Sequence, residues 1–277
     1  MSIVFEHRNP RVRSLLPALL KVCTNTFIHK FIVRSILFEG LGEALAEHYH
    51  RHCISCERII LISRNKDKLE TIRARLGERI SIYACDVTDA DKMKEILNEI
   101  HRLYGRIDIL FANAGVSYRQ LSLKKTFDQA VRETLDVNIM GVINSFLPLI
   151  EMKGVHQIAL ISSQAAYATL VSPIYGASKQ CLVSLGYDFR RILAKDEIAV
   201  NIVSPGPIRT PMLTGSYSKS VKRGVDPEVA AKIIADGLRL NLAEIVFPAT
   251  TGIFQYMLSY LPLSVAEVVA SFLLGTK

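Results

Sequence analysis

The sequence predicts an α/β protein whose core is a doubly wound parallel sheet of the Rossmann-like type, folded as a single domain. Short apolar runs rich in Ile and Val alternate with longer amphipathic segments along most of the chain. This alternation is typical of parallel strands joined by helical crossovers, and strands buried on both faces read as continuous apolar runs. A chain of 277 residues can bury such a core without disulfides or a structural metal.

The expected elements follow one another in a regular order. The expected strands cover residues 58–65, 80–87, 107–115, 157–163, 198–206 and 243–248. The expected helices cover residues 66–77, 89–104, 127–151, 174–195 and 226–240. Because strand–helix–strand units are nearly always right-handed, these elements should wind into one sheet. We expect the sheet domain at 31–248, an atypical N-terminal extension at 1–30 and an apolar tail packed on the domain at 249–277.

The composition argues against nucleic-acid partners. The net charge is +8, but Lys and Arg are scattered and the chain has no Trp, so no basic stripe with interleaved aromatic residues is formed. The five cysteines are an odd number and accompany no secretory signal. This usage is typical of reduced thiols and predicts a cytoplasmic protein.

The segment "HYHRHCISC" gathers residue types that bind metals. It contains His48, His50, His52, Cys53 and Cys56. No second Cys or His pair lies nearby in the sequence to complete a closed site. We therefore interpret the segment as the end of a helix with solvated histidines, and we expect no metal.

The tail carries no charge from Ile245 to Ala266, a stretch of 22 residues that is long enough to span a bilayer. Pro248, Gly252 and Pro262 interrupt it, together with several hydroxyl and amide side chains. We therefore expect a last strand followed by apolar helices that line a substrate cleft, cover the sheet edge or contact a membrane surface peripherally.

The strongest chemical signal is "YGASK", which places Tyr175 and Lys179 four residues apart. Residues at this spacing share one face of a helix. An ammonium beside a phenol favours the phenolate and lowers its pKa from about 10. Such a tyrosine is suited to exchange a proton with a carbonyl or alcohol oxygen.

Further polar groups lie where the expected strands end or inside an apolar helix. They are Asp86, Asn113-Ala114-Gly115, Asn138, Ser162-Ser163, and Pro205-Gly206 with Thr210. Taken together and in this order with Tyr175 and Lys179, these motifs resemble the short-chain dehydrogenase/reductase family over roughly residue 31 to the end.

The resemblance implies a nicotinamide cofactor and an Asn-Ser-Tyr-Lys tetrad. In that scheme Tyr175 is the acid/base, Lys179 lowers its pKa and holds the nicotinamide ribose, and Asn138 anchors a water. A serine polarises the substrate oxygen, and both candidates stay open. The usual spacing from Tyr175 selects Ser162, whereas alignment of the serine pair selects Ser163, which we favour.

The cofactor type is indicated by the end of the second expected strand. Family members that prefer NAD have an acidic residue at this position, which binds the ribose 2′-hydroxyl. This chain has Arg64 followed by Asn65, and a guanidinium suits a 2′-phosphate. We therefore expect NADP, with NAD as the less favoured cofactor.

The phosphate-binding turn is atypical. Set on Gly40 and Gly42, the family's pattern Thr-Gly-x-x-x-Gly-x-Gly puts Ile36 where the first glycine belongs. A β-branched residue opposes the backbone conformation of a tight turn. Phe38 and Glu39 bring bulk and negative charge toward the place of an anion. Half of the site therefore matches the family and half opposes it.

Three explanations of the turn stay open. The chain binds its cofactor weakly or in a changed pose, it is a non-catalytic relative, or the residues before Gly40 come from a shifted reading frame. Arg-Ser-Ile-Leu-Phe can be encoded as AGG AGC ATC CTC TTC. Read one base later, this string begins GGA GCA TCC TCT, which encodes Gly-Ala-Ser-Ser, the small-residue turn that the family would have here.

Two classes of function follow from these observations. The favoured one is an NADP-dependent oxidoreductase acting on a small carbonyl or alcohol, with an apolar substrate indicated by the tail and by residues 207–225. The alternative is a non-catalytic binding or scaffolding protein. The resemblance also implies a homo-oligomer formed through the long helices at 127–151 and 174–195.

Overall fold

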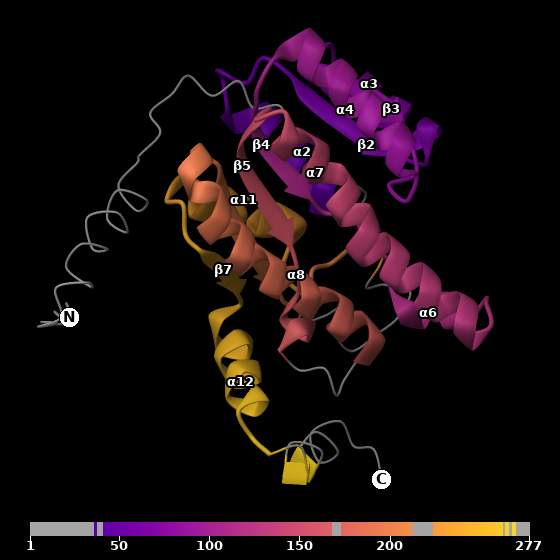
Figure 1. Ribbon diagram of the computed structural model, residues 1–277, viewed down its shortest axis with the longest axis vertical. Helices are drawn as coiled ribbons and strands as arrows, with labels where there is room; N and C mark the ends of the chain where they lie inside the picture. The colour runs from indigo at the N-terminus through magenta and orange to yellow at the C-terminus, as the bar shows by residue number, and fades with distance from the viewer. Residues whose placement is uncertain are drawn as a thin grey trace, which may run out of the picture.

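Parallel strands form the centre of the structure, and helices cover both faces of the sheet (Figure 1). The computed structural model describes residues 36–37, 41–167, 173–210, 212, 224–262, 264–265 and 268–269. Within these ranges the strands are β1 (Ile36–Leu37), β2 (Ile59–Ser63), β3 (Ile80–Ala84), β4 (Ile107–Ala112), β5 (Val155–Ile161), β6 (Ala199–Pro205) and β7 (Glu244–Phe247).

The strand order is that of a doubly wound sheet. Hydrogen bonds join β1-β2-β3 in one direction and β4-β5-β6-β7 in the other, and every pair is parallel. β1 contacts β4, so the two halves adjoin at the middle of the sheet. The predicted α/β Rossmann-like fold is therefore confirmed.

The helices separate into two layers. They are α2 (Leu41–His52), α3 (Lys66–Leu76), α4 (Ala90–Tyr104), α5 (Tyr118–Ser122), α6 (Phe127–Leu135), α7 (Val142–Glu151), α8 (Pro173–Leu193), α11 (Pro227–Arg239) and α12 (Ala249–Ser259). One buried cluster joins α2, α3 and α11 to the sheet, and the other joins α4, α7 and α8 to it. Burial of these apolar side chains is the main stabilising contribution to the fold.

Capping side chains mark where several helices begin. Asn65 and Asp89 accept hydrogen bonds from the backbone N–H of the third residue of α3 and of α4, at 3.0 Å each. Thr126 and Gln129 form a reciprocal capping box at the start of α6. Such caps satisfy N–H groups that have no partner within the helix. The expected helix boundaries agree with these positions to within a residue or two.

The helix expected at 127–151 contains an irregularity. A π-helical stretch, η1 (Asp136–Gly141), separates α6 from α7. π-helical turns insert one extra residue per turn and occur frequently at functional sites. Asn138 lies in this stretch, so the helix changes its geometry where the candidate amide is located.

The start of the sheet differs from the prediction. Ile36 was expected in the phosphate-binding turn, but Ile36 and Leu37 form β1 and pair with Ile60 and Leu61 of β2. Ile36, which is β-branched, has a high propensity for strands. Residues 38–40 connect β1 to α2. Phe38, Glu39 and Gly40 themselves lie outside the described residues.

The tail contributes one further helix, α12, which lies against the end of the sheet (Figure 1). Its Tyr256 ring stacks on the ring of Tyr167, with 4.1 Å between centroids. On the other side of α12, Ile253 and Met257 are exposed, so the helix packs through one face. Among the described residues, no helix combines the length and the apolar character needed to cross a bilayer.

Candidate active site

The loops that follow β4, β5 and β6 meet the first turns of α8. Asn113-Ala114-Gly115 follows β4, Ser162-Ser163 follows β5, and Pro205-Gly206 closes β6. α8 brings Tyr175 and Lys179 against these loops. Carboxyl ends of parallel strands meet at one edge of the sheet, which is where open α/β proteins bind ligands.

Tyr175 is half-buried beside Ser163. Burial raises the pKa of the Tyr175 phenol above its ordinary value, and a hydrogen bond from the Ser163 side chain acts in the opposite direction. The sequence had led us to expect a lowered pKa from Lys179. The Lys179 Nζ lies 5.8 Å from the centroid of the Tyr175 ring. Desolvation of the phenolate therefore outweighs the hydrogen bond in the chain on its own.

Lys179 presents a buried ammonium to the same space. Its side chain is 2% exposed, and burial lowers its pKa to about 8. Nζ donates to the carbonyl of Ile161 at 3.0 Å. An ammonium has three donors, and that contact uses one of them. A Cβ at Gly115 would lie 3.3 Å from Nζ, so glycine leaves room beside the ammonium.

The two serines after β5 have different surroundings. The Ser162 hydroxyl is buried and donates to the backbone carbonyl of Lys179 at 2.8 Å, which fixes α8 to the strand. The Ser163 Oγ accepts from the backbone N–H of Ala165 at 3.1 Å and reaches the carbonyl of Pro205 at 3.5 Å. Of the pair, Ser163 is the residue whose side chain meets Tyr175.

Asn138 is held by protein groups on every side. Its Oδ1 accepts from the backbone N–H of Val116 at 2.7 Å. Its Nδ2 donates to the carbonyl of Val116 at 3.2 Å and to the Ser178 hydroxyl at 3.0 Å. The amide therefore ties η1 to the loop after β4 and to α8. Both amide donors are engaged, so a water beside Asn138 would donate to it, either at the remaining lone pair of Oδ1 or at the backbone carbonyl.

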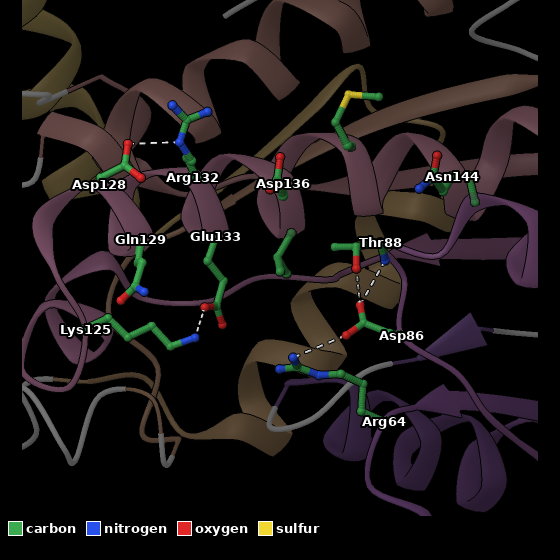
Figure 2. Close-up of a pocket in the computed structure, with 13 residues that line it drawn as sticks. Arg64, Asp86, Thr88, Lys125, Asp128, Gln129, Arg132, Glu133, Asp136 and Asn144 are labelled. Carbon is green, nitrogen blue, oxygen red and sulfur yellow. Dashed lines mark hydrogen bonds and ion pairs between the residues drawn. The ribbon is translucent and has the colours of Figure 1, made fainter.

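A second region lies on the same edge, beside β2 and β3. There a cleft of about 930 Å³ is lined by Arg64, Asp86 and Thr88 on one side and by residues of α6 and η1 on the other (Figure 2). Arg64 forms an ion pair with Asp86 at 3.4 Å, and Asp86 also accepts two hydrogen bonds from Thr88. Burial raises the pKa of Asp86, but the Thr88 bonds and the Arg64 charge together hold it below its ordinary value.

The remaining cofactor candidates occupy different positions. Gly42 is buried in the first turn of α2, whereas Gly40 lies outside the described residues. The backbone N–H of Gly206 donates to the carbonyl of Phe247 at 2.7 Å. Thr210 follows in the next turn, with its N–H bonded to the carbonyl of Ile208 at 2.7 Å.

Two separate groups of these residues suit the two ends of a nicotinamide dinucleotide. The buried Lys179 ammonium with the open space at Gly115 suits a ribose diol, and the Arg64 guanidinium suits a phosphate at the other end. The phosphate turn between these two places falls on residues 38–40, where the structure gives no geometry.

The His/Cys segment shows no gathering of ligands. His50 contacts Arg79 through Nδ1 at 3.1 Å and through its carbonyl at 2.7 Å. Cys56 is buried and its Sγ reaches the carbonyl of Arg58 at 3.8 Å. Within the part of the chain that the structure describes, no group of three or more His, Cys, Asp or Glu side chains is arranged to hold a metal.

Sequence reasoning missed Gln164, which directly follows Ser163. Its side chain is 2% exposed, and it bonds to Pro248 and Thr251, which are 84 and 87 residues away in the sequence. A buried glutamine in the segment "ISSQAAY" was the available signal, because buried amides need partners. The sequence alone does not identify those partners.

Comparison with known proteins identifies the family of the chain. A model of the short chain dehydrogenase family matches residues 37–220. An uncharacterized oxidoreductase of Staphylococcus aureus (strain N315) is 29% identical over 203 residues, covering 70% of this chain and 84% of that protein. One from Staphylococcus epidermidis is 32% identical over 184 residues, covering 64% and 77%.

Solved structures share the fold. A short-chain dehydrogenase/reductase from Brucella melitensis, described as a glucose/ribitol dehydrogenase, superposes with a TM-score of 0.66 at 26% identity, covering 78% of this chain and 94% of its own. An alcohol dehydrogenase from the archaeon Thermococcus sibiricus, complexed with 5-hydroxy-NADP, gives 0.65 at 21% identity, covering 78% and 95%. The second likeness concerns the fold alone.

Proposed function

Because the chain belongs to the short-chain dehydrogenase family of NAD(P)-dependent oxidoreductases, we propose that it transfers a hydride between NADP and a carbonyl or secondary alcohol. The observation that carries this proposal is the meeting of Ser163, Tyr175 and Lys179 at the carboxyl edge of β5. These three side chains supply a hydroxyl donor, a proton-transferring phenol and a buried cation at one place on the sheet edge.

Tyr175 is the acid/base of the proposed reaction. Its raised pKa keeps the phenol protonated near neutral pH, which suits donation of a proton to a carbonyl oxygen. Ser163 donates a hydrogen bond to the same oxygen and polarises it. The bound nicotinamide supplies or accepts the hydride.

Lys179 and Asn138 support this pair. The two Lys179 donors that Ile161 leaves unused suit the hydroxyls of a nicotinamide ribose. Asn138 holds the loop after β4 against α8 through Val116 and Ser178, which keeps the space at Gly115 open. A water that relays protons from Lys179 would be held by the backbone of η1.

The preference for NADP rests on Arg64. Its guanidinium is exposed in the cleft, and within the part of the chain that the structure describes its ion-pair partner is Asp86. An exposed ion pair of this kind contributes little to stability, so Arg64 can exchange Asp86 for a 2′-phosphate at small cost. Asp86 would then face the adenosine half of the cofactor.

An apolar substrate is supported by the surface near the loop after β6. Leu123, Phe127 and Met212 are exposed there. Gln120 of α5 donates to the carbonyl of Met212 at 3.0 Å, which places this loop beside α5. Aliphatic and aromatic side chains around a few polar groups are typical of pockets for small apolar ligands.

We also propose a homo-oligomer that associates through the long helices. Leu147 of α7 and Tyr187 and Ile192 of α8 are exposed. Exposed apolar side chains on adjacent helices are a common feature of subunit interfaces. Light scattering of the purified chain, compared with an Ile192→Lys variant, tests this point.

The decisive experiment is a fluorescence titration of the chain with NADPH and with NADH, followed by a screen of ketones, aldehydes and secondary alcohols for turnover. The proposal expects micromolar binding of NADPH, weaker binding of NADH and turnover of at least one apolar carbonyl. No NADPH binding up to millimolar concentration would contradict it.

A further inference from the structure

Gln164 ties the loop that carries Ser163 to the beginning of α12. Its Nε2 donates to the carbonyl of Pro248 at 2.9 Å, and its Oε1 accepts from the Thr251 hydroxyl at 2.8 Å. A carbonyl only accepts hydrogen bonds, so the amide nitrogen must face Pro248 and the amide oxygen must face Thr251. Both polar ends of a buried side chain are therefore satisfied by the segment after β7.

The same amide packs against the turn that faces the Ser163 hydroxyl. Ser163 Oγ reaches the carbonyl of Pro205 at 3.5 Å. The next residue is Gly206, where a Cβ would lie 2.9 Å from the Oε1 of Gln164. Glycine thus permits a close approach between this turn and the amide. Gln164 is therefore linked to Ser163 in two ways. It is the next residue in the chain, and its amide packs against Gly206, which follows the Pro205 carbonyl that Ser163 reaches.

The hydroxyl of Ser163 has a choice of acceptors. Its single hydrogen is within reach of the Pro205 carbonyl and of the Tyr175 oxygen. Because the Pro205 contact is long, a small displacement of the loop changes which acceptor is used. The orientation of Ser163 therefore depends on how firmly its loop is anchored.

A second anchor lies at the far end of the same short helix, η2 (Gln164–Ala166). The Tyr167 hydroxyl bonds to Ser204 at 3.1 Å and to Glu244. Glu244 also accepts from Tyr256 of α12 at 2.6 Å. This anchor holds η2 and α12 together four residues away from Ser163, so it offers a matched comparison for Gln164.

We propose that Gln164 is a positioning residue, which keeps the Ser163 hydroxyl on the Tyr175 phenol by fixing the serine loop to Pro248 and Thr251. The inference rests on the proposed function, in which Ser163 and Tyr175 act on one substrate oxygen. The proposal gives α12 a supporting role: it anchors the serine loop and contributes none of the proposed catalytic residues.

The test is an absorbance titration of tyrosinate in the full-length chain, which needs neither cofactor nor substrate. Subtracting the titration of the same variant carrying Tyr175→Phe isolates the signal of Tyr175. We expect Gln164→Met to raise the Tyr175 midpoint by roughly 0.5 to 1 pH unit, the amount that corresponds to one lost hydrogen bond. Ser163→Ala should give the same shift, and the two changes together should give no more than either alone.

Matched variants separate positioning from loss of stability. Thr251→Val removes one bond to Gln164 and should shift the midpoint in the same direction, whereas Thr251→Ser keeps the hydroxyl and should restore the wild-type value. Tyr256→Phe loosens α12 at the second anchor and should leave the midpoint unchanged. If Gln164→Met does not fold, the Thr251 pair carries the test.

Two results would overturn the proposal. One is a wild-type midpoint in Gln164→Met and Thr251→Val while Ser163→Ala shifts it. The other is an equal shift in Tyr256→Phe, which would indicate general loosening. Failure of the proposed function is recognised separately, because NADPH binding and turnover would then be missing while the Tyr175 shift persists.

Discussion

The two halves of the sheet differ in how closely their sequences match the family pattern. β4 to β7 pair in register over five, five and four residues, and their carboxyl ends carry Ser163 and the turn at Pro205. β1 pairs with β2 at Ile36 and Leu37, and Ile36 stands where the family pattern has its first glycine. The half that holds the chemical groups carries the family's motif residues, whereas the half that should hold the cofactor phosphates departs from the family pattern at residues 36–39.

Because of this difference, turnover and cofactor affinity should depend on different parts of the chain. The proposed catalytic side chains are held by β4 to β7, η1 and α8, none of which depends on residues 36–39 for its pairing. In the proposed function, cofactor affinity depends strongly on the turn after β1 and on Arg64 at the end of β2. Substitutions of Arg64 and of the turn should therefore change cofactor affinity, whereas substitutions of Ser163 and Tyr175 should change turnover.

The largest effect is expected in the catalytic half. Tyr175→Phe removes only the phenolic hydroxyl, so turnover of a carbonyl found by screening should fall by about 10² to 10⁴, the usual contribution of a positioned acid. Circular dichroism and NADPH affinity should stay near wild type. Wild-type turnover in this variant would show that Tyr175 is not the acid/base.

A second effect in the same half concerns Lys179 and pH. Its folded-state pKa is about 8, against an ordinary value of 10.5. Between about pH 8 and pH 10.5 the unfolded chain therefore binds a proton that the folded chain has released, and stability should rise with pH. Below that window the protonated ammonium is buried at a constant penalty, on the order of 3 kcal/mol.

Chemical denaturation of wild type and Lys179→Met across this window measures that effect. The Met variant lacks the titrating group, so the wild type should gain on it as the pH rises from 8 to 10.5. Parallel stability curves for the two chains would mean that Lys179 titrates normally and is not buried as a cation.

The cofactor half supplies the next test. Arg64→Asp should weaken NADPH binding by about 1.5 to 3 kcal/mol, roughly tenfold to a hundredfold, the loss of a charged hydrogen bond. NADH, which lacks the 2′-phosphate, should lose less or gain. Arg132→Asp is the matched control, because Arg132 lines the same cleft and pairs with Asp128. Equal losses for both cofactors would show that Arg64 does not contact the 2′-phosphate.

The sequence predicts the fold well because its signals are local. Runs such as "IILIS" and "IDILFA" are apolar enough to be recognised as buried strands without any partner, and both form strands. The π-helical stretch around Asn138 was not predicted, because it follows from contacts with Val116 and Ser178 in other elements. Short stretches of sequence do not predict contacts between residues of different elements.

The candidate site shows the same limit. The spacing of Tyr175 and Lys179 predicts that they share a helix face, but burial decides the direction of the Tyr175 pKa, and burial depends on the whole fold. Ser162 and Ser163 are adjacent and chemically identical, so only the register of β5 separates their surroundings. The start of the turn was misplaced because apolar residues at 36 and 37 fit a strand as well as a defective turn.

The smallest expected effect is a gain, obtained by repairing the turn. The family pattern suggests replacing residues 36–39 by Gly-Ala-Ser-Ser. Ile36 and Leu37, however, pair with β2, and glycine in a strand lowers stability by about 0.5 to 1 kcal/mol. We therefore expect the double change Phe38→Ser with Glu39→Ser to strengthen NADPH binding without loss of thermal stability. The four-residue change should bind at least as well but melt at a lower temperature.

The reason for the gain is electrostatic and steric. Glu39 lies two residues before α2 in the sequence. The N-terminus of a helix favours an anion such as a phosphate, and a carboxylate at the same place would repel that phosphate. Removing that charge should strengthen phosphate binding by about 0.3 to 1 kcal/mol, a twofold to fivefold gain in affinity. Glu39→Ser alone separates charge from the bulk of Phe38. If all three variants are folded and bind NADPH no better than wild type, residues 38–39 do not oppose the cofactor. The contrast between the two halves of the sheet would then be one of sequence pattern and not of binding.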